Sequence, residues 1–70
     1  GYLAHRRMRE AAILSRVAQG ARTVPEIVAQ IYADVDPRLH GAAALSTRAH
    51  LDHLVEQEKL KVRDGIYEAV

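Results

Sequence analysis

Two histidines three positions apart are the first residues whose spacing could do chemistry. His50 and His53 would lie on one side of a helix, and two imidazoles at that spacing can chelate a metal ion. His40 could lie near them. Zinc normally takes three or four protein ligands, and the chain has no cysteine to complete a set. We therefore expect solvated helix residues here and predict no metal ligand in this chain.

Other catalytic arrangements are not recognisable in the sequence. No serine has histidine and acidic partners in a recognisable pattern, and there is no cysteine nucleophile. No glycine-rich loop that could cradle a phosphate occurs. Asp34 and Asp36 flank an expected turn, where bonds from side chain to backbone explain them better than acid–base catalysis. The sequence thus predicts no catalytic and no cofactor-binding residue.

Basic residues at the N-terminus form the remaining candidate site. The chain has 70 residues and a formal net charge of +1, which is too little to attract nucleic acid strongly. Up to Arg22 the only acid is Glu10, against five arginines: Arg6, Arg7, Arg9, Arg16 and Arg22. In residues 23–58 six acids outnumber two arginines. The basic surface is therefore expected near the N-terminus.

A helix is predicted over about residues 4–19, and it would position these basic residues. This stretch has good helix formers, and Gly20 follows as a stop. In its second half Ile13, Leu14, Val17 and Ala18 form one apolar arc at helical spacing. In the first half of the helix, the same side carries the charged residues Arg6, Arg7 and Glu10. One small core cannot explain the whole helix, so we expect its first half to reach out of the domain.

Two further helices are predicted. Thr23-Val24-Pro25-Glu26 is a capping box that starts the second helix, with proline in the first turn. The helix should end at Asp34-Val35-Asp36-Pro37, because a residue before proline avoids helical geometry. A third helix should span roughly residues 41–58, with a core stripe of Ala44, Thr47, Leu51, Leu54 and Val55.

The last segment is typical of a β-hairpin. Residues 60–63 and 66–69 flank Asp64-Gly65, a favoured two-residue turn. Helix, helix, turn, helix and hairpin is the order of a winged helix-turn-helix, so we predict a mainly α domain with three helices and a wing. The expected cross-strand pairs are Val62–Tyr67 and Leu60–Ala69 on the inner face and Lys61–Glu68 on the outer face.

Winged helices often bind DNA, but the outward side of the expected third helix argues against that function. A recognition helix presents Arg, Lys, Asn or Gln to the bases. Carboxylates repel phosphate, and Asp64 and Glu68 offset the basic residues of the wing. We expect this side or the first helix to pack on another domain. By helical projection the outward residues are Leu45, Ala49, Asp52, His53 and Glu56.

Several motifs occur in the order of a known family. They are Tyr2-Leu3-Ala4-His5-Arg6, Arg9-Glu10 and Ile13-Leu14, then Thr23 to Val28 with Ile31-Tyr32, Asp36 to His40, Ala42-Ala43, His50-Leu51 and Leu54. Together they resemble the β-lactamase-associated winged-helix domain, the C-terminal domain of metallo-β-lactamase-fold hydrolases (lactamase-β-like). Relatives usually have glycine just after the third helix, where Glu58-Lys59 stand here. We therefore expect the turn into the wing to be reshaped or strained.

The resemblance implies that residues 1–70 form one accessory domain of a larger protein. The parent would be a zinc-dependent hydrolase that uses a metal-bound hydroxide on an ester, thioester, lactam or phosphodiester bond. Its zinc ligands would lie in the preceding domain, in His-x-His-x-Asp-His motifs that are absent here. In relatives the winged helix packs beside the catalytic face and helps wall the substrate groove. The candidate contacts to that domain or to an anionic substrate are Tyr2, His5, Arg6, Arg7 and Arg9.

Two other functions stay open. A stand-alone nucleic-acid binder, with RNA favoured over duplex DNA, would use Arg6, Arg7 and Arg9 with Lys61 and Arg63 of the wing. A protein–protein module would instead associate through Met8 and Leu45. No apolar stretch reaches membrane-spanning length, no signal peptide is visible, and the lack of cysteine fits a reducing compartment. We therefore expect a cytoplasmic location and no membrane partner.

Overall fold

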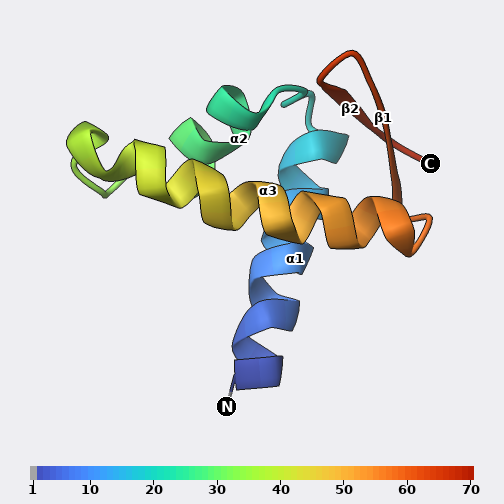
Figure 1. Cartoon of the computed structure of the whole chain (residues 1–70), viewed down its shortest axis with the longest axis horizontal. Coiled ribbons are helices and arrows are strands. Elements are labelled where there is room, and N and C mark those ends of the chain that lie inside the picture. The colour runs from blue at the N-terminus through green and yellow to red at the C-terminus, as the bar shows by residue number, and fades with distance from the viewer. Residues whose placement is uncertain (1) are drawn as a thin grey trace.

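The computed structural model describes residues 2–70, with side chains from residue 4 onward. Its elements are α1 (Tyr2–Ala18), α2 (Val24–Ile31), the 3-10 helix η1 (Pro37–Leu39), α3 (His40–Glu56), β1 (Leu60–Arg63) and β2 (Ile66–Ala69). Three helices followed by an antiparallel hairpin confirm the predicted winged helix. In Figure 1, α3 runs across the middle, with α2 and the hairpin on one side and the N-terminal end of α1 on the other.

The hydrophobic core lies where the three helices and the hairpin meet. It confirms the predicted apolar arc of α1 and the stripe of α3, although Ala18 is exposed and Ala44 and Val55 are only half-buried. Burial of one large aliphatic side chain contributes about 1.5–3 kcal/mol, so a core this small stabilises the fold modestly. The buried cluster comprises Ile13, Val17, Ala21, Ile27, Leu51, Leu54, Leu60 and Tyr67.

Helix α2 begins at the predicted capping box. Thr23 is the N-cap, and its Oγ1 accepts a hydrogen bond from the backbone N–H of Glu26 at 3.3 Å. The Thr23 hydroxyl also donates to the Glu26 carboxylate at 2.9 Å. These bonds satisfy a donor that the first turn leaves free, which fixes where the helix starts.

The predicted end of α2 at residues 34–37 is wrong, because the helix stops at Ile31. His40 Nε2 donates to the carbonyl oxygens of Tyr32 at 3.1 Å and Val35 at 3.2 Å, so a side chain replaces further helical bonds. Asp36 then caps η1 by accepting from the backbone N–H of Arg38 at 2.9 Å. This bond confirms the structural role that we predicted for Asp36.

The turn from α3 into the wing has the strained form that the missing glycine led us to expect. Glu58 adopts the left-handed conformation with φ 61°. Its N–H donates to the Val55 oxygen and the Lys59 N–H donates to the Leu54 oxygen, both at 2.9 Å. This pair of bonds is a Schellman motif, in which glycine normally takes the position that Glu58 occupies.

The wing has the predicted register, with Leu60 opposite Ala69 and Val62 opposite Tyr67. The backbone N–H of Tyr67 donates to the carbonyl of Arg22 at 2.7 Å, which ties β2 to the segment between α1 and α2. The inner-face prediction is wrong for Val62 and Ala69, which are exposed. Of these four residues only Leu60 and Tyr67 reach the core. Val62 lies nearer the turn, where the wing extends past the core, and Ala69 is exposed although its partner Leu60 is buried.

Candidate functional site

The N-terminal half of α1 extends past α3 and away from the rest of the domain (Figure 1). No side chain from Ala4 to Arg9 is buried, and Met8 is 72% exposed. Farther along the helix, Ile13 and Val17 are buried in the core. The prediction that the first half of this helix reaches out of the domain is therefore confirmed.

The buried carboxylate of Glu10 connects this half of α1 to α3. Its Oε2 accepts hydrogen bonds from Nδ1 of His53 at 3.0 Å, Nδ1 of His50 at 3.2 Å and Nε of Arg6 at 3.2 Å. The Glu10 side chain is only 10% exposed. Because a carboxylate can only accept, both imidazole rings carry a proton on Nδ1. We call these four residues the Glu10 cluster.

The electrostatics of the Glu10 cluster favour the ionised carboxylate. Burial raises the pKa of the Glu10 carboxyl, but the hydrogen bonds from His50, Arg6 and His53 outweigh burial and hold that pKa below its ordinary value. The Glu10 carboxylate is therefore a negative charge at the middle of the cluster, and it attracts donors from both helices. In this way it fixes the position of Arg6 and of both histidines.

The prediction that His50 and His53 are solvated is wrong, as is the outward position predicted for His53. Among the residues that the structure describes, no group of three or more His, Asp or Glu side chains could hold a metal ion. Both Nδ1 atoms donate to the same oxygen of Glu10, so the rings face an acceptor instead of a common cation. His40 lies apart, on the carbonyls of Tyr32 and Val35. Within the described part of the chain, His40, His50 and His53 therefore do not form a shared set of metal ligands.

The predicted contact residues lie around the Glu10 cluster. The α1–α3 hollow is lined by His5, Arg6, Arg9, Tyr32, Ser46 and His50. In it the guanidinium carbon of Arg9 lies 4.7 Å from the centre of the Tyr32 ring. A second hollow, which contains the exposed Arg7, is lined by Arg6, Arg7, Glu10, His53, Gln57 and Lys59. The structure thus brings His5, Arg6 and Arg9 together, whereas the side chain of Tyr2 lies outside the described residues.

The exposed side of α3 has little attraction for nucleic acid. Leu45 is 76% exposed, and Ala49, Asp52 and Glu56 are also exposed, as predicted. Two carboxylates on this face repel phosphate and outnumber Arg48, the exposed arginine of α3 that lies at the border of this face. The exposed side of α3 therefore has the composition that, in the sequence, argued against reading of duplex DNA.

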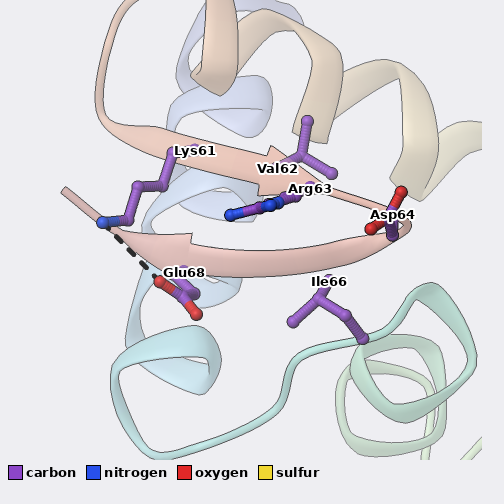
Figure 2. A pocket seen from close by; sticks show the side chains of 6 residues that line it. All are labelled: Lys61, Val62, Arg63, Asp64, Ile66 and Glu68. Atoms are coloured by element: carbon purple, nitrogen blue, oxygen red, sulfur yellow. Dashed lines mark ion pairs between the residues drawn. The ribbon is translucent and has the colours of Figure 1, made fainter.

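The wing carries a third hollow, which mixes both charges. Figure 2 shows its lining residues: Lys61, Val62, Arg63, Asp64, Ile66 and Glu68. Lys61 Nζ lies 3.6 Å from Oε2 of Glu68 across the two strands, which confirms the predicted outer-face pair. Asp64 stands at the turn, at the opposite end of the hairpin from Lys61 (Figure 2). The acids compensate for Lys61 and Arg63, so the wing presents no surface of a single sign.

Comparison with protein families supports the same fold. A family model described as beta-lactamase associated winged helix domain matches residues 23–67. The match runs from the capping box of α2 to Tyr67 in β2 and covers more than half of the chain. The family-like motifs of α1 precede the match and stay a prediction. No curated protein and no solved structure matches the chain. Of the helices in the described residues, none combines the length and the apolar character needed to cross a membrane.

Proposed function

Since the chain belongs to the family of β-lactamase-associated winged-helix domains, we propose that it is the non-catalytic accessory domain of a zinc-dependent metallo-β-lactamase-fold hydrolase. In this proposal it follows the catalytic domain in the same polypeptide. It packs on that domain through α1 and helps to shape the substrate groove. The catalytic domain supplies every zinc ligand and carries out the hydrolysis.

The projecting half of α1 is the observation that carries this proposal. Ala4, Met8 and Ala11 are exposed and follow one another at helical spacing, so they form an apolar stripe on the side away from the core. Helical projection places Arg7 at one border of the stripe and Ala12 and His5 at the other. Most helical stability in proteins comes from packing of an apolar face, and residues 4–9 bury no side chain within this domain. A neighbour in contact with the stripe supplies that packing.

The test compares two apolar side chains of nearly equal exposure, Met8 on α1 at 72% and Leu45 on α3 at 76%. Each is changed to Glu in the 70-residue chain and in the full-length polypeptide. In the 70-residue chain both changes should alter the free energy of unfolding by less than about 0.5 kcal/mol. In the full-length polypeptide, Met8→Glu buries an unpaired charge and should lower the thermal midpoint and the hydrolytic rate, whereas Leu45→Glu should change neither.

Measurements on the same proteins can also contradict the proposal. The full-length polypeptide should contain zinc, measured by elemental analysis, and the 70-residue chain should contain none. Equal effects of Met8→Glu and Leu45→Glu in the full-length polypeptide would contradict docking through α1. A zinc-free full-length polypeptide would contradict the hydrolase assignment. Steeply salt-dependent binding of oligonucleotides by the 70-residue chain would favour a nucleic-acid function instead.

A further inference from the structure

We propose that the α1–α3 hollow is a binding site for a phosphate group. Its six lining residues include three with basic side chains that reach it from α1, namely His5, Arg6 and Arg9. Tyr32, Ser46 and His50 complete the lining, and none of the six is acidic. This inference goes beyond the proposed function, because it assigns a ligand to the winged-helix domain itself.

Arg9 is held in place before any ligand arrives. Its guanidinium carbon lies 4.7 Å from the centre of the Tyr32 ring, which is a cation–π distance. Stacking of this kind leaves the N–H groups at the edge of the guanidinium plane free to donate. A planar guanidinium matches two phosphate oxygens at once. Because Tyr32 already restricts the Arg9 side chain, binding costs less conformational entropy than at a mobile surface arginine.

The Glu10 cluster positions two further groups of the hollow. Arg6 donates to Glu10 through Nε alone, which leaves both terminal amino groups for a ligand. His50 uses Nδ1 for the same oxygen, and its Nε2 can donate to a ligand only in the imidazolium form of the ring. Ser46 lies one helical turn before His50 on α3 and adds a hydroxyl that can donate. The hollow therefore combines side chains from α1 and α3 whose spacing the Glu10 cluster fixes.

The absence of an acid in the lining distinguishes this hollow from the other two described above. Glu10 itself lines the hollow that contains Arg7 and Lys59, and Asp64 and Glu68 line the hollow of the wing. The α1–α3 hollow, by contrast, has no acid in its lining. The carboxylate of Glu10 is buried, and its Oε2 already accepts three hydrogen bonds. An anion with several acceptor oxygens, such as a phosphate group, suits such a set of donors.

The test titrates the 70-residue chain with inorganic phosphate, adenosine monophosphate and uncharged adenosine at low ionic strength, followed by amide NMR and calorimetry. Phosphate and adenosine monophosphate should shift the amide signals of Arg9, Ser46 and His50, and adenosine should not. Equal affinities would identify the bare phosphate group as the recognised unit. Tighter binding of the nucleotide would identify a phosphate carried by a nucleoside.

Matched variants localise the site. Arg9→Gln should weaken binding about tenfold, because it removes a charge-assisted donor, whereas Arg63→Gln makes the same charge change on the wing and should weaken it less than about twofold. Ser46→Ala, at an exposed position that does not support the core, provides a second variant and should also weaken binding. Equal losses for Arg9→Gln and Arg63→Gln, signal shifts confined to the wing, or the absence of phosphate binding would overturn the proposal. None of these outcomes depends on docking to a catalytic domain.

Discussion

Replacement of Glu10 tests whether its carboxylate holds α1 against α3. Glu10→Gln keeps the size of the side chain but removes its charge. In the native protein Oε2 accepts from Arg6, His50 and His53 at 3.0–3.2 Å. A glutamine offers one uncharged accepting oxygen and an amino group that can only donate. The three donors must then share a weaker acceptor or turn toward water.

The expected size of the effect follows from the exposure of the partners. A hydrogen bond to a charged group contributes about 1.5–3 kcal/mol. The three bonds cannot be summed, because they share one oxygen and the side chains of Arg6, His50 and His53 are 31%, 20% and 30% exposed and can be hydrated. We expect the loss of about one such bond, ~2 kcal/mol, which lowers the thermal midpoint of a domain of this size by about 8–16 °C.

The pH dependence of the stability difference between the native protein and Glu10→Gln shows whether the charge or the shape of the Glu10 side chain is responsible. The folded pKa of Glu10 lies below the unfolded value, so its stabilising contribution is complete above the unfolded pKa and is lost as pH falls through the folded pKa. The difference in unfolding free energy between the native protein and Glu10→Gln should therefore be fully present above about pH 5 and shrink from about pH 5 to pH 3. The lowered pKa of Asp36 acts in both proteins and cancels.

Urea unfolding at a series of pH values measures this difference. Glu56→Gln removes a carboxylate from an exposed position of α3 and serves as the control, with no comparable loss expected. A difference below about 0.5 kcal/mol at pH 7 would refute the role assigned to the Glu10 cluster. A difference that stays the same at pH 3 would show that the shape of the side chain, and not its charge, is responsible.

Two further predictions concern the backbone and the core. Glu58→Gly should raise the free energy of unfolding by about 1 kcal/mol, because glycine removes the steric cost of the left-handed conformation at φ 61°, and thermal unfolding measures the change. A lower midpoint would contradict the strain assigned to this turn. Thr47→Val should also stabilise the fold by about 1 kcal/mol, since Thr47 Oγ1 is buried with no hydrogen-bond partner among the described atoms. A destabilised variant in urea unfolding would mean that the hydroxyl is satisfied in solution.

The fold could be predicted from the sequence because its determinants are local. The cap at Thr23 and the Asp64-Gly65 turn act over a few residues and both occur where expected, although the Glu26 carboxylate accepts from the Thr23 hydroxyl and not from its backbone N–H. The end of α2 escaped prediction because a side chain beyond the helix, His40, takes up the carbonyls that decide it. The exposure of Val62 also escaped, because strand register determines which residues share a face but not how far the core extends beneath them.

The Glu10 cluster could be predicted only in part. Glu10 lies on the continuation of the apolar arc, and an acid on the core side of a helix requires donors. Its partners His50 and His53 follow 40 and 43 residues later, so their contact depends on how α1 crosses α3. Helical projection treats the core as a single direction. It therefore placed His53 outside, although α1 packs against that flank of α3.

The two proposals use different sides of the same helix, and Arg9 lies at their border. Met8 points away from the core, on the side proposed to meet a catalytic domain, whereas Arg6 and Arg9 line the α1–α3 hollow. Met8 and Arg9 also line a shared hollow with His5 and Ala12, so a domain docked on the stripe of Met8 would adjoin the α1–α3 hollow. A phosphate group held by Arg9 would then be within reach of both domains. The Glu10 cluster makes this arrangement possible, because it fixes the projecting half of α1 relative to α3 before either partner binds.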